Sequence, residues 1–438
     1  MRRLLLILAA ATSVAGCSMS SPDPVADPIG PQGAAPAGAQ VPAVDPDTPS
    51  GWGPTRGEIN QARALVAVMP VEQRAWQVLM PAFWGFAADE ATPAEALRNR
   101  SSHGVDTVLA ALRTHGYGGL FVKPEVIEDA SQVHDLVEDL HLRGDGPEGL
   151  PLLVSVDQEG GVVQRIKEGV TRVPTAQSIG ATGNLRLARR IARNNGEEMR
   201  ALGFTMMLAP VADVDTAGNN LVASRSYASG YAEAAAMVKA SVRGYLDAGI
   251  IPVVKHFPGH GSVSGDSHRS LPVQDKSVSE LMRTDLRPFR AVIDAGAPAI
   301  MTGHIAVPAL EAEIPTSLSP GMVQGVLREG LGFAGLVVTD SQGMAPVNAV
   351  YGSAEGAVRS LIAGNDLVLN SADVTEAHTG VVRAVRSGRL PGVRLTDAAT
   401  RVVAVRLYQQ RIGADRPDLS VLRSPGHLAD AARVAAGG

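Results

Sequence analysis

Two parts of the sequence supply side chains that could transfer protons and attack an electrophilic carbon. Residues 255–268 read KHFPGHGSVSGDSH, and the end of this glycine-rich segment places Asp266 two positions before His268. At that spacing the carboxylate of Asp266 can orient the imidazole of His268 and raise its basicity, which suits a group that gives and takes a proton. Asp340 follows an apolar run later in the chain and adds a further candidate carboxylate.

Cleavage of a glycosidic bond needs this combination: a proton donor to the leaving oxygen, and a nucleophile or base on the other face of the sugar. Candidate carboxylates are Asp157, Asp266 and Asp340, and candidate proton carriers are His256, His260, His268 and His304. Lys255 and His256 end a predicted strand, so they are better placed as rigid donors to hydroxyl groups. The loop glycines would let Asp266 and His268 swing over a bound sugar.

The same residues allow other interpretations. Three histidines and one aspartate within thirteen residues of this segment could form a metal site, because histidine is a common ligand. The segment could also be a plain surface turn. Asp340 taken alone could cap the helix that follows a strand. Residue types and spacing leave these alternatives open.

The elements that would position these groups are strand-like apolar runs alternating with helical patterns. Eight runs are predicted as strands: 78–83, 118–122, 152–157, 205–211, 252–257, 299–304, 335–340 and 366–369. Most are continuous apolar runs, as expected for parallel strands buried on both faces. Eight such units with helices between them predict an α/β fold, a single (β/α)8 TIM-like barrel.

Helix signals lie between the strands. Asn184 precedes a helical pattern as a possible cap, and an Ala-rich stretch over 231–248 ends before Gly249, where a left-handed cap is expected. Residues 277–280 have the form of a capping box, and Ser319-Pro320 indicates a helix start. Each helix would return the chain to the start of the next strand.

Polar residues cluster where the predicted strands end. They are Asp157, Gln158, Glu159, Asp213, Asp215, Lys255, His256, His304, Asp340 and Asn370. In barrels of this kind the active site lies at the carboxyl ends of the strands. The pattern therefore predicts one polar site at that end.

The first residues, MRRLLLILAAATSVAGC, have a basic start, a short apolar run and small residues before Cys17. Val14-Ala15-Gly16-Cys17 resembles a bacterial lipobox, in which the peptide is cut before the cysteine and that cysteine is lipidated. The alternative is an ordinary signal peptide with a chance cysteine. Cys17 is the only cysteine of the sequence, so intrachain disulfides and cysteine-based catalysis or zinc binding are excluded.

These patterns divide the chain into a lipoprotein signal peptide (1–17), a Pro/Ala/Gly tether too poor in apolar residues to fold (18–54), a catalytic barrel (55–415) and a C-terminal tail (416–438). The expected location is extracytoplasmic, with lipid anchoring to a bacterial membrane. The formal net charge of -5 argues against a nucleic-acid partner, which would require a basic face.

Four motifs in order resemble glycoside hydrolase family 3, in its β-N-acetylglucosaminidase branch. KHFPGHGSVSGDSH is similar to the signature segment of that branch, VDQEGGVVQR (156–165) to its sugar-binding third strand, ASRSY (223–227) to its arginine loop, and VVTDSQGM (337–344) to its nucleophile strand. The resemblance covers most of residues 57–411.

The resemblance implies a role for each matching residue. Asp340 would be the nucleophile that forms a covalent glycosyl-enzyme, and His268 the acid/base, oriented by Asp266. The sugar-binding residues would be Asp157, Arg165, Arg225, Lys255 and His256. The implied activity is retaining hydrolysis of terminal β-linked N-acetylglucosamine from cell-wall saccharides, without a cofactor or metal.

The chain departs from the family pattern in two places. Ser341 and Gln342 follow Asp340 where a second acidic residue and Leu are usual, and Val162 stands where a basic residue is common. These differences put recognition of the leaving group in doubt. Remaining alternatives are phosphorolysis or β-glucosidase activity in the same family, a metal-dependent hydrolase, and a sugar-binding lipoprotein without catalysis.

Overall fold

A computed structural model describes residues 45–144, 149–218 and 222–437. The chain divides into two units, 1–43 and 44–438, of which the second is described below. The expected signal peptide, its lipidated Cys17 and most of the expected tether lie outside the described residues.

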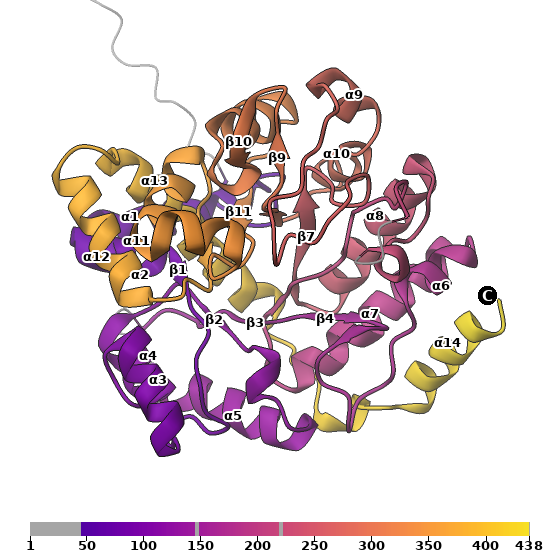
Figure 1. Ribbon diagram of the computed structural model, residues 1–438. Helices are drawn as coiled ribbons and strands as arrows, with labels where there is room; N and C mark the ends of the chain where they lie inside the picture. The colour runs from indigo at the N-terminus through magenta and orange to yellow at the C-terminus, as the bar shows by residue number, and fades with distance from the viewer. Residues whose placement is uncertain (1–44, 145–148, 219–221, 438) are drawn as a thin grey trace, which may run out of the picture. The chain divides into compact units, whose positions relative to one another are not determined.

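Parallel strands form the centre of the unit (Figure 1). In spatial order the larger sheet consists of β11 (Leu336–Thr339), β8 (Ala299–Thr302), β7 (Ile251–Phe257), β6 (Met206–Met207), β3 (Val154–Val156) and β2 (Leu120–Phe121). A second parallel pair joins β1 (Leu79–Met80) to β12 (Val368–Leu369). Each predicted run overlaps one of these strands, and the result is a TIM-barrel-like α/β fold.

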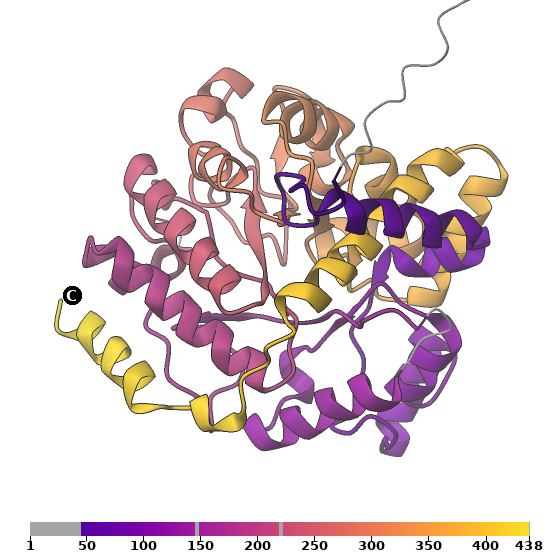
Figure 2. The same cartoon turned by 180° about the vertical axis from the view of Figure 1, so that it is seen from behind.

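Helices follow the strands and cover their outer side (Figures 1 and 2). In chain order they are α1 (Arg56–Val68), α2 (Val71–Gln77), α3 (Pro93–His103), α4 (Val108–His115), α5 (Ala130–Arg143), α6 (Ala176–Ala181), α7 (Leu185–Ala201), α8 (Tyr231–Asp247), α9 (Val278–Arg283), α10 (Arg287–Ile293), α11 (Ala345–Ala363), α12 (Val374–Arg386), α13 (Gly392–Ile412) and α14 (Pro425–Ala435). The 3-10 turns are η1 (Pro124–Val126), η2 (Ala223–Arg225), η3 (Thr316–Leu318) and η5 (Leu419–Val421).

The local signals identified in the sequence account for several helix ends. The Asn184 side chain accepts from the Leu187 N–H at the start of α7, and Gly249 adopts a φ of 71° just after α8. Ser277 forms the predicted capping box with Glu280. The helix predicted after Ser319 is present, but as a π-helix, η4 (Gly321–Gly330), and not as an α-helix.

Two short hairpins interrupt the strand–helix alternation. β4 (Gln158–Gly160) and β5 (Val163–Gln164) follow β3, and β9 (Ala306–Val307) and β10 (Glu311–Pro315) follow β8. The buried side chain of Gln158 stabilises the first hairpin, because its carbonyl oxygen accepts hydrogen bonds from the Arg165 and Ile166 N–H groups at 2.8 and 3.0 Å. This hairpin carries Glu159 and presents Arg165 after it.

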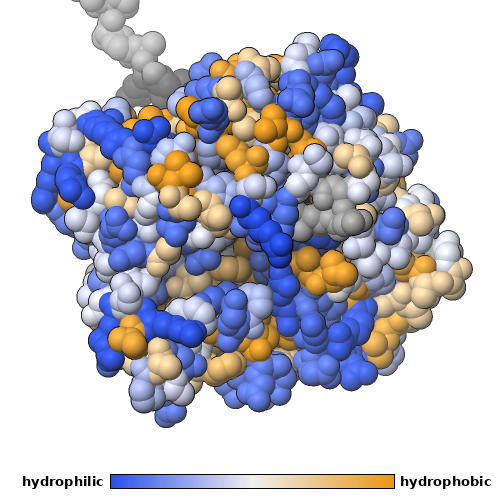
Figure 3. All heavy atoms as spheres, in the orientation of Figure 1, coloured by the Kyte–Doolittle hydropathy of each residue, from blue (hydrophilic) through white to orange (hydrophobic). Residues whose placement is uncertain are grey.

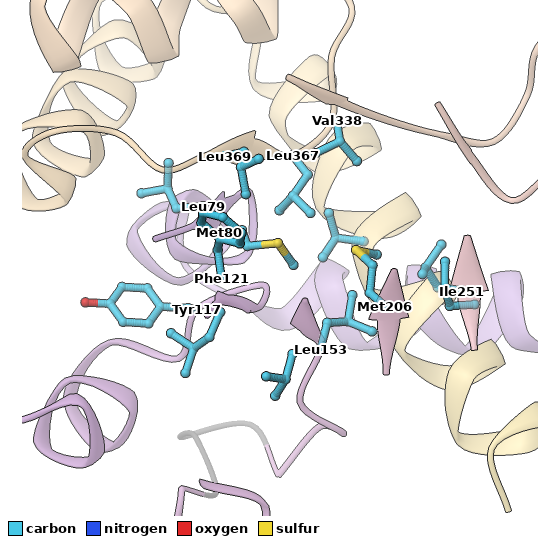
Figure 4. Close-up of a cluster of buried hydrophobic side chains, with 14 of the residues drawn as sticks. Leu79, Met80, Tyr117, Phe121, Leu153, Met206, Ile251, Val338, Leu367 and Leu369 are labelled. Atoms are coloured by element: carbon cyan, nitrogen blue, oxygen red, sulfur yellow. The ribbon is translucent and has the colours of Figure 1, made fainter. Parts of the chain in front are cut away.

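Apolar side chains from the strands fill the centre of the unit (Figure 4). Met80 and Phe121 belong to one buried cluster with residues of distant strands, including Met206, Ile251 and Leu369, and all but Phe121 are at most 2% exposed. Fully burying a side chain of this size contributes about 1.5–3 kcal/mol. The core therefore holds the strands whose carboxyl ends carry the polar residues.

The packed unit begins before residue 55, where the tether was expected to end. Trp52 is 8% exposed and belongs to the main core, and Pro49 forms an antiparallel bridge with Thr55. At the other end, α14 packs on α7. Hydrophilic residues predominate on the face shown in Figure 3, with apolar residues in small separate groups. Within the described ranges, no helix combines the length and apolar character needed to span a membrane.

Candidate active site

The predicted site residues meet in one cleft of about 490 Å³ at the carboxyl ends of the strands. Its lining includes all the predicted sugar-binding and catalytic residues except Asp266, namely Asp157, Arg165, Arg225, Lys255, His256, His268 and Asp340. Asp266 contacts His268 from outside the lining. The tertiary structure thus brings together residues that lie at or after the ends of four different strands, β3, β6, β7 and β11.

A chain of alternating charges forms one wall. Lys255 Nζ lies 2.6 Å from Asp157 Oδ1 and 2.7 Å from Glu159 Oε1. Glu159 in turn accepts two hydrogen bonds from the Arg225 guanidinium, at 2.7 and 2.8 Å. Asp157 is the most exposed of the four side chains, at 20%, and it offers its carboxylate to the cleft. Lys255 fixes the position of Asp157, and Glu159 in turn fixes Lys255 and Arg225.

Burial and neighbouring charges shift the pKa values in this wall in opposite directions, and the effect of the charges is the larger one. Burial alone would raise the pKa of Glu159, but Arg225 and Lys255 bring it well below the ordinary value of 4.5. Burial likewise works against a charged Lys255, yet Asp157 and Glu159 raise its pKa. Both groups are therefore ionised at neutral pH, and Lys255 and Arg225 remain hydrogen-bond donors.

A second buried carboxylate orients His256. Asp213 Oδ2 lies 2.7 Å from His256 Nδ1, and Asp213 Oδ1 accepts from the His260 N–H at 2.7 Å. Burial opposes the charge of Asp213, but the neighbouring His256 lowers its pKa to about 2. Because a carboxylate only accepts, His256 donates through Nδ1. The tautomer of the ring is thereby set, and Nε2 is left for the cleft.

Asp340 is held as an anion. Its Oδ1 accepts from the Ser341 N–H at 2.7 Å. Burial would raise the pKa of Asp340, but His256, His304, the Ser341 N–H and Lys255 lower it. α11 begins only at Ala345, with Met344 before it, so Asp340 does not cap that helix. An ionised, partly exposed carboxylate in a cleft fits a nucleophile.

His304 was a candidate proton carrier, and the structure gives it a different place. It is fully buried, with Nδ1 2.7 Å from Ser317 Oγ and Nε2 2.9 Å from the Ser341 carbonyl. Both ring nitrogens are thus engaged, and burial lowers its pKa. His304 therefore contacts the backbone beside Asp340 through the Ser341 carbonyl and does not line the cleft.

The Asp266–His268 pair lies at the rim of the cleft. Asp266 Oδ1 is 2.7 Å from His268 Nδ1 and also accepts from the His268 N–H at 2.9 Å. The His268 side chain is 60% exposed, against 11% for His256. The His268 N–H and imidazole lower the pKa of Asp266, so this carboxylate is ionised and keeps a proton on Nδ1. The opposite nitrogen, Nε2, is then the atom that can exchange a proton with a substrate.

The loop that carries this pair is anchored at its base and exposed at its tip. Gly261 packs so closely on the chain after β6 that a Cβ atom would lie 2.3 Å from the Val214 carbonyl oxygen. Ser262 Oγ bonds Asp285 Oδ1 at 2.5 Å and accepts from Gln274 at 2.6 Å. By contrast Ser264, Gly265, His268 and Arg269 are exposed. This arrangement permits motion of the tip over a rigid base.

Arg165 adds a further cation to the lining of the cleft. Its Nε atom is buried and forms no hydrogen bond with any residue in the described ranges. A buried guanidinium N–H without a partner is costly unless a ligand supplies one. Val162, where the family often has a basic residue, is 68% exposed and also lines the cleft.

Sequence reasoning did not assign Glu159 and Asp213 to the site. Both had been noted as polar residues after strands, but neither stood out from its neighbours. Glu159 lies two residues after Asp157, and alternation within the hairpin places both carboxylates on Lys255. For the metal alternative, no group of three or more His, Cys, Asp or Glu within the part of the chain described is arranged to hold a metal ion.

Comparisons with known proteins agree with this geometry. Residues 73–405 match the family model "Glycosyl hydrolase family 3 N terminal domain". The beta-hexosaminidase LpqI of Mycobacterium tuberculosis is 37% identical over 273 residues, covering 60% of this chain and 69% of that protein. A beta-hexosaminidase of Stenotrophomonas maltophilia is 40% identical over 225 residues, covering 50% of this chain and 67% of that protein.

The fold is also similar to that of a solved structure from the same family. The family 3 beta-N-acetylglucosaminidase from Paenibacillus sp. FPU-7 superposes with a TM-score of 0.76 at 33% identity, over 84% of this chain and 69% of that one. The family model spans more than half of the chain, and the relatives exceed 30% identity. The chain therefore belongs to glycoside hydrolase family 3 and is a glycoside hydrolase.

Proposed function

We propose that the protein is a retaining exo-β-N-acetylglucosaminidase. The observation that carries the proposal is the meeting of an ionised Asp340 and the Asp266-bound His268 on one cleft. These are the nucleophile and the proton donor that a double displacement requires. Relatives named beta-hexosaminidase and beta-N-acetylglucosaminidase support the choice of sugar.

In the first step, an Asp340 oxygen attacks the anomeric carbon and forms a glycosyl ester. His268 Nε2 gives its proton to the leaving oxygen as the glycosidic bond breaks, while Asp266 stabilises the imidazolium that has carried the proton. In the second step, His268 takes a proton from water, and the hydroxide attacks the same carbon and releases Asp340. Two inversions retain the β configuration.

The ion-pair wall would bind the terminal sugar. Asp157 can accept from hydroxyl groups, and Lys255, Arg225 and His256 can donate to them at positions set by their buried partners. Donors held in advance stabilise the developing charge without reorganisation in the transition state. Arg165 supplies a further donor whose Nε needs an acceptor.

We further infer that the two parallel sheets close into one eight-stranded barrel. Single parallel bridges support this, because Ala82 pairs with Phe121 between β1 and β2, and Val338 pairs with Leu367 between β11 and β12. Closure would point every strand end at the same cleft.

The natural substrate that we propose is a peptidoglycan-derived saccharide, met outside the cytoplasm by an enzyme lipid-anchored through Cys17. The lipobox-like start of the chain supports this location. A Cys17→Ser variant should move from the membrane fraction to the soluble fraction, or stay in the cytoplasm unprocessed. Continued membrane association of that variant would contradict the anchor.

The activity is tested with residues 45–438, which include the packed segment before α1. Initial rates on a chromogenic β-N-acetylglucosaminide should exceed those on the β-glucoside, and phosphate should not change them. A rate that depends on phosphate, with a sugar phosphate as product, would show phosphorolysis instead.

The mechanism has its own test. His268→Ala should lose activity on a substrate with a poor leaving group far more than on one with a good leaving group, because only the former needs a proton donor. Near wild-type activity of that variant on the poor leaving group would reject His268 as the acid/base. Sugar binding without turnover would instead support a non-catalytic protein.

A further inference from the structure

The loop that carries His268 consists of a first arm (258–263), a tip (264–270) and a second arm (271–277), and both arms reach one buried carboxylate. In the first arm, Ser262 Oγ donates to Asp285 Oδ1 at 2.5 Å. In the second arm, Lys276 Nζ lies 2.5 Å from Asp285 Oδ2. Asp285 thus binds each arm through a different carboxylate oxygen.

A direct contact between the arms adds to this connection. Gln274 donates through Nε2 to Ser262 Oγ at 2.6 Å, so the Ser262 hydroxyl links Gln274 to Asp285. His268 is the middle residue between Ser262 and Gln274 along the chain. The positions of these two ends therefore set the region that His268 can reach.

The second arm is also joined to the hairpin that follows β8. Val273 forms a parallel bridge with Ala306, and the Gln274 N–H donates to the Ala306 carbonyl at 2.8 Å. The Ala306 N–H donates in return to the Pro272 carbonyl at 2.9 Å. These bonds fix the backbone of the second arm, and Asp285 connects the first arm to it.

The position of Asp285 is itself fixed by the core. Its side chain is fully buried between α9 and α10, and the Leu286 N–H next to it donates to the Leu281 carbonyl at 2.9 Å. Phe289 of α10 contacts Phe257, the last residue of β7, edge-on, with ring centroids 5.5 Å apart. The segment that carries Asp285 therefore packs on the end of β7, from which the loop starts.

Close packing and charge both fix the loop to Asp285. A Cβ atom at Gly259, whose φ is 123°, would lie only 2.9 Å from Asp285 Cβ, so the backbone of the first arm is in direct contact with Asp285. Burial opposes the charge of Lys276, but Asp285 and Tyr231 raise its pKa. The ion pair to the second arm is therefore present at neutral pH.

We propose that Asp285 is a positioning residue for the acid/base. By fixing both arms of the loop, it keeps His268 where Nε2 can protonate the leaving oxygen. This inference rests on the proposed function, because it takes His268 as the proton donor. Asp285 does not line the cleft, so its effect on the reaction passes through His268.

The test measures kcat/KM on two aryl β-N-acetylglucosaminides, one with a good and one with a poor leaving group. This quantity covers the cleavage of the glycosidic bond, in which only the poor leaving group needs a proton from His268. Ser262→Ala removes the hydroxyl between Asp285 and Gln274 but keeps the ion pair of Asp285 with Lys276, so the variant should fold. We expect kcat/KM to fall roughly tenfold on the poor leaving group and less than about twofold on the good one.

A second variant and a matched control locate the effect. Asp285→Asn removes the charge that attracts Lys276, and its loss on the poor leaving group should be larger, about 30-fold. Thr284→Ala is the control, because the Thr284 hydroxyl donates to Asp285 Oδ2 at 2.9 Å but directly follows α9 and is not on the loop. It should leave the ratio of the two kcat/KM values unchanged. Equal losses on both leaving groups in Ser262→Ala would overturn the proposal.

A double-mutant cycle separates positioning from general damage to the fold. In the His268→Ala background, Ser262→Ala should cause no further loss on the poor leaving group, because the side chain that it positions is gone. Losses that multiply in the double variant would overturn the proposal, since Ser262 and Asp285 would then act independently of His268.

Hydrogen exchange distinguishes a failure of this inference from a failure of the proposed function. Backbone amides of residues 259–277 should exchange faster in Ser262→Ala and Asp285→Asn than in wild type, and at the wild-type rate in Thr284→Ala. Unchanged exchange in Asp285→Asn would overturn the inference and leave the proposed function intact. A His268→Ala variant that keeps its activity on the poor leaving group would reject the proposed acid/base and this inference together.

Discussion

The two histidine–aspartate pairs at the cleft differ in how far their side chains are exposed to solvent. Both have Nδ1 2.7 Å from a carboxylate oxygen. Asp213 is fully buried beneath His256, whereas Asp266 and His268 are 39% and 60% exposed on a loop tip. The first pair suits a rigid donor. The second pair is able to approach and leave a substrate oxygen and to exchange protons with water.

The Asp266→Asn substitution should lower kcat about 10- to 100-fold and change KM little, since the amide no longer stabilises a charged His268. The loss should be larger on an aryl glucosaminide with a poor leaving group. Initial rates on two leaving groups check this. Asp275→Asn, at an exposed position after the same loop, is the control and should behave as wild type. An equal loss on both substrates would contradict a role in protonation.

Glu159 is the residue on which the ion-pair wall depends. Glu159→Gln leaves Lys255 and Arg225 without their shared anion, so we expect a loss of about 3 kcal/mol in unfolding free energy and a fall in kcat/KM of roughly 100-fold. Urea denaturation and initial rates measure the two effects. Glu168→Gln removes a carboxylate that is 75% exposed and should change neither.

The sign of the pH dependence follows from the same wall. Folding lowers the pKa of Glu159 below its ordinary value of 4.5. Its contribution to stability is therefore present above that pH and is lost as the pH falls. Between wild type and Glu159→Gln, the difference in unfolding free energy should shrink on acidification. A difference that stays constant down to strongly acidic pH would contradict this account.

At the scale of elements, the site depends on where each strand ends. β11 ends at Thr339, immediately before Asp340, and its other end is tied by Asp366. Asp366 Oδ2 accepts from the Val337 N–H at 2.9 Å and pairs with Arg328 at 2.5 Å, while Oδ1 pairs with Arg394 at 2.7 Å. One buried carboxylate thus joins β11 to η4 and α13.

Asp366→Asn should destabilise the fold by about 3–5 kcal/mol, because three arginines, Arg401 included, lose a fully buried partner. Protein that remains folded should keep a kcat close to wild type, since the site itself is intact. Chemical denaturation and active-site-normalised rates test both expectations. The matched control is Asp397→Asn, because Asp397 pairs with two of the same arginines, Arg394 and Arg401, but is 50% exposed. This substitution should lower the unfolding free energy by less than about 1 kcal/mol.

At the scale of the whole described unit, one histidine contributes a pH-dependent contact between the last helix and α7. His427 of α14 lies 3.0 Å from Glu198 and 3.2 Å from Glu197, both on α7. Burial would lower the pKa of His427, but the two glutamates raise it from 6.5 to about 9. Because Glu198 also accepts from Thr171 and Arg423, this contact joins the helix to two loops.

A raised pKa in the folded state gives stability that is fully present below pH 6.5 and is lost as the pH rises through about 9. His427→Gln should therefore cost about 1 kcal/mol at pH 6, after allowance for solvent screening, and nothing near pH 10. Thermal melts across this range test the difference. Leu428→Ala, at a neighbouring position of α14 that is 41% exposed, should show no such pH dependence. A cost of His427→Gln that does not vary with pH would contradict the ion pair.

Much of the architecture could be predicted because its signals are local. Each of the eight apolar runs overlaps a strand, and the caps at Asn184 and Ser277 begin their helices as expected. Such features depend on backbone hydrogen bonds and burial within a few residues. The π-helical form of the segment after Ser319 and the burial of Trp52 were missed. Trp52 is buried because it packs in the main core, which residues distant in the sequence form.

The sequence by itself determined which predicted strands end in polar residues and how far apart Asp266 and His268 lie along the chain. It also contains the motifs that identify the family. Only the tertiary structure decided which polar residues from different strand ends pair. Glu159 holds Lys255 and Arg225, and His304 turns away from the cleft. The reason is physical: spacing along the chain sets local geometry, whereas the pairing of charges from different strands depends on how the strands pack and how far each charge is removed from water.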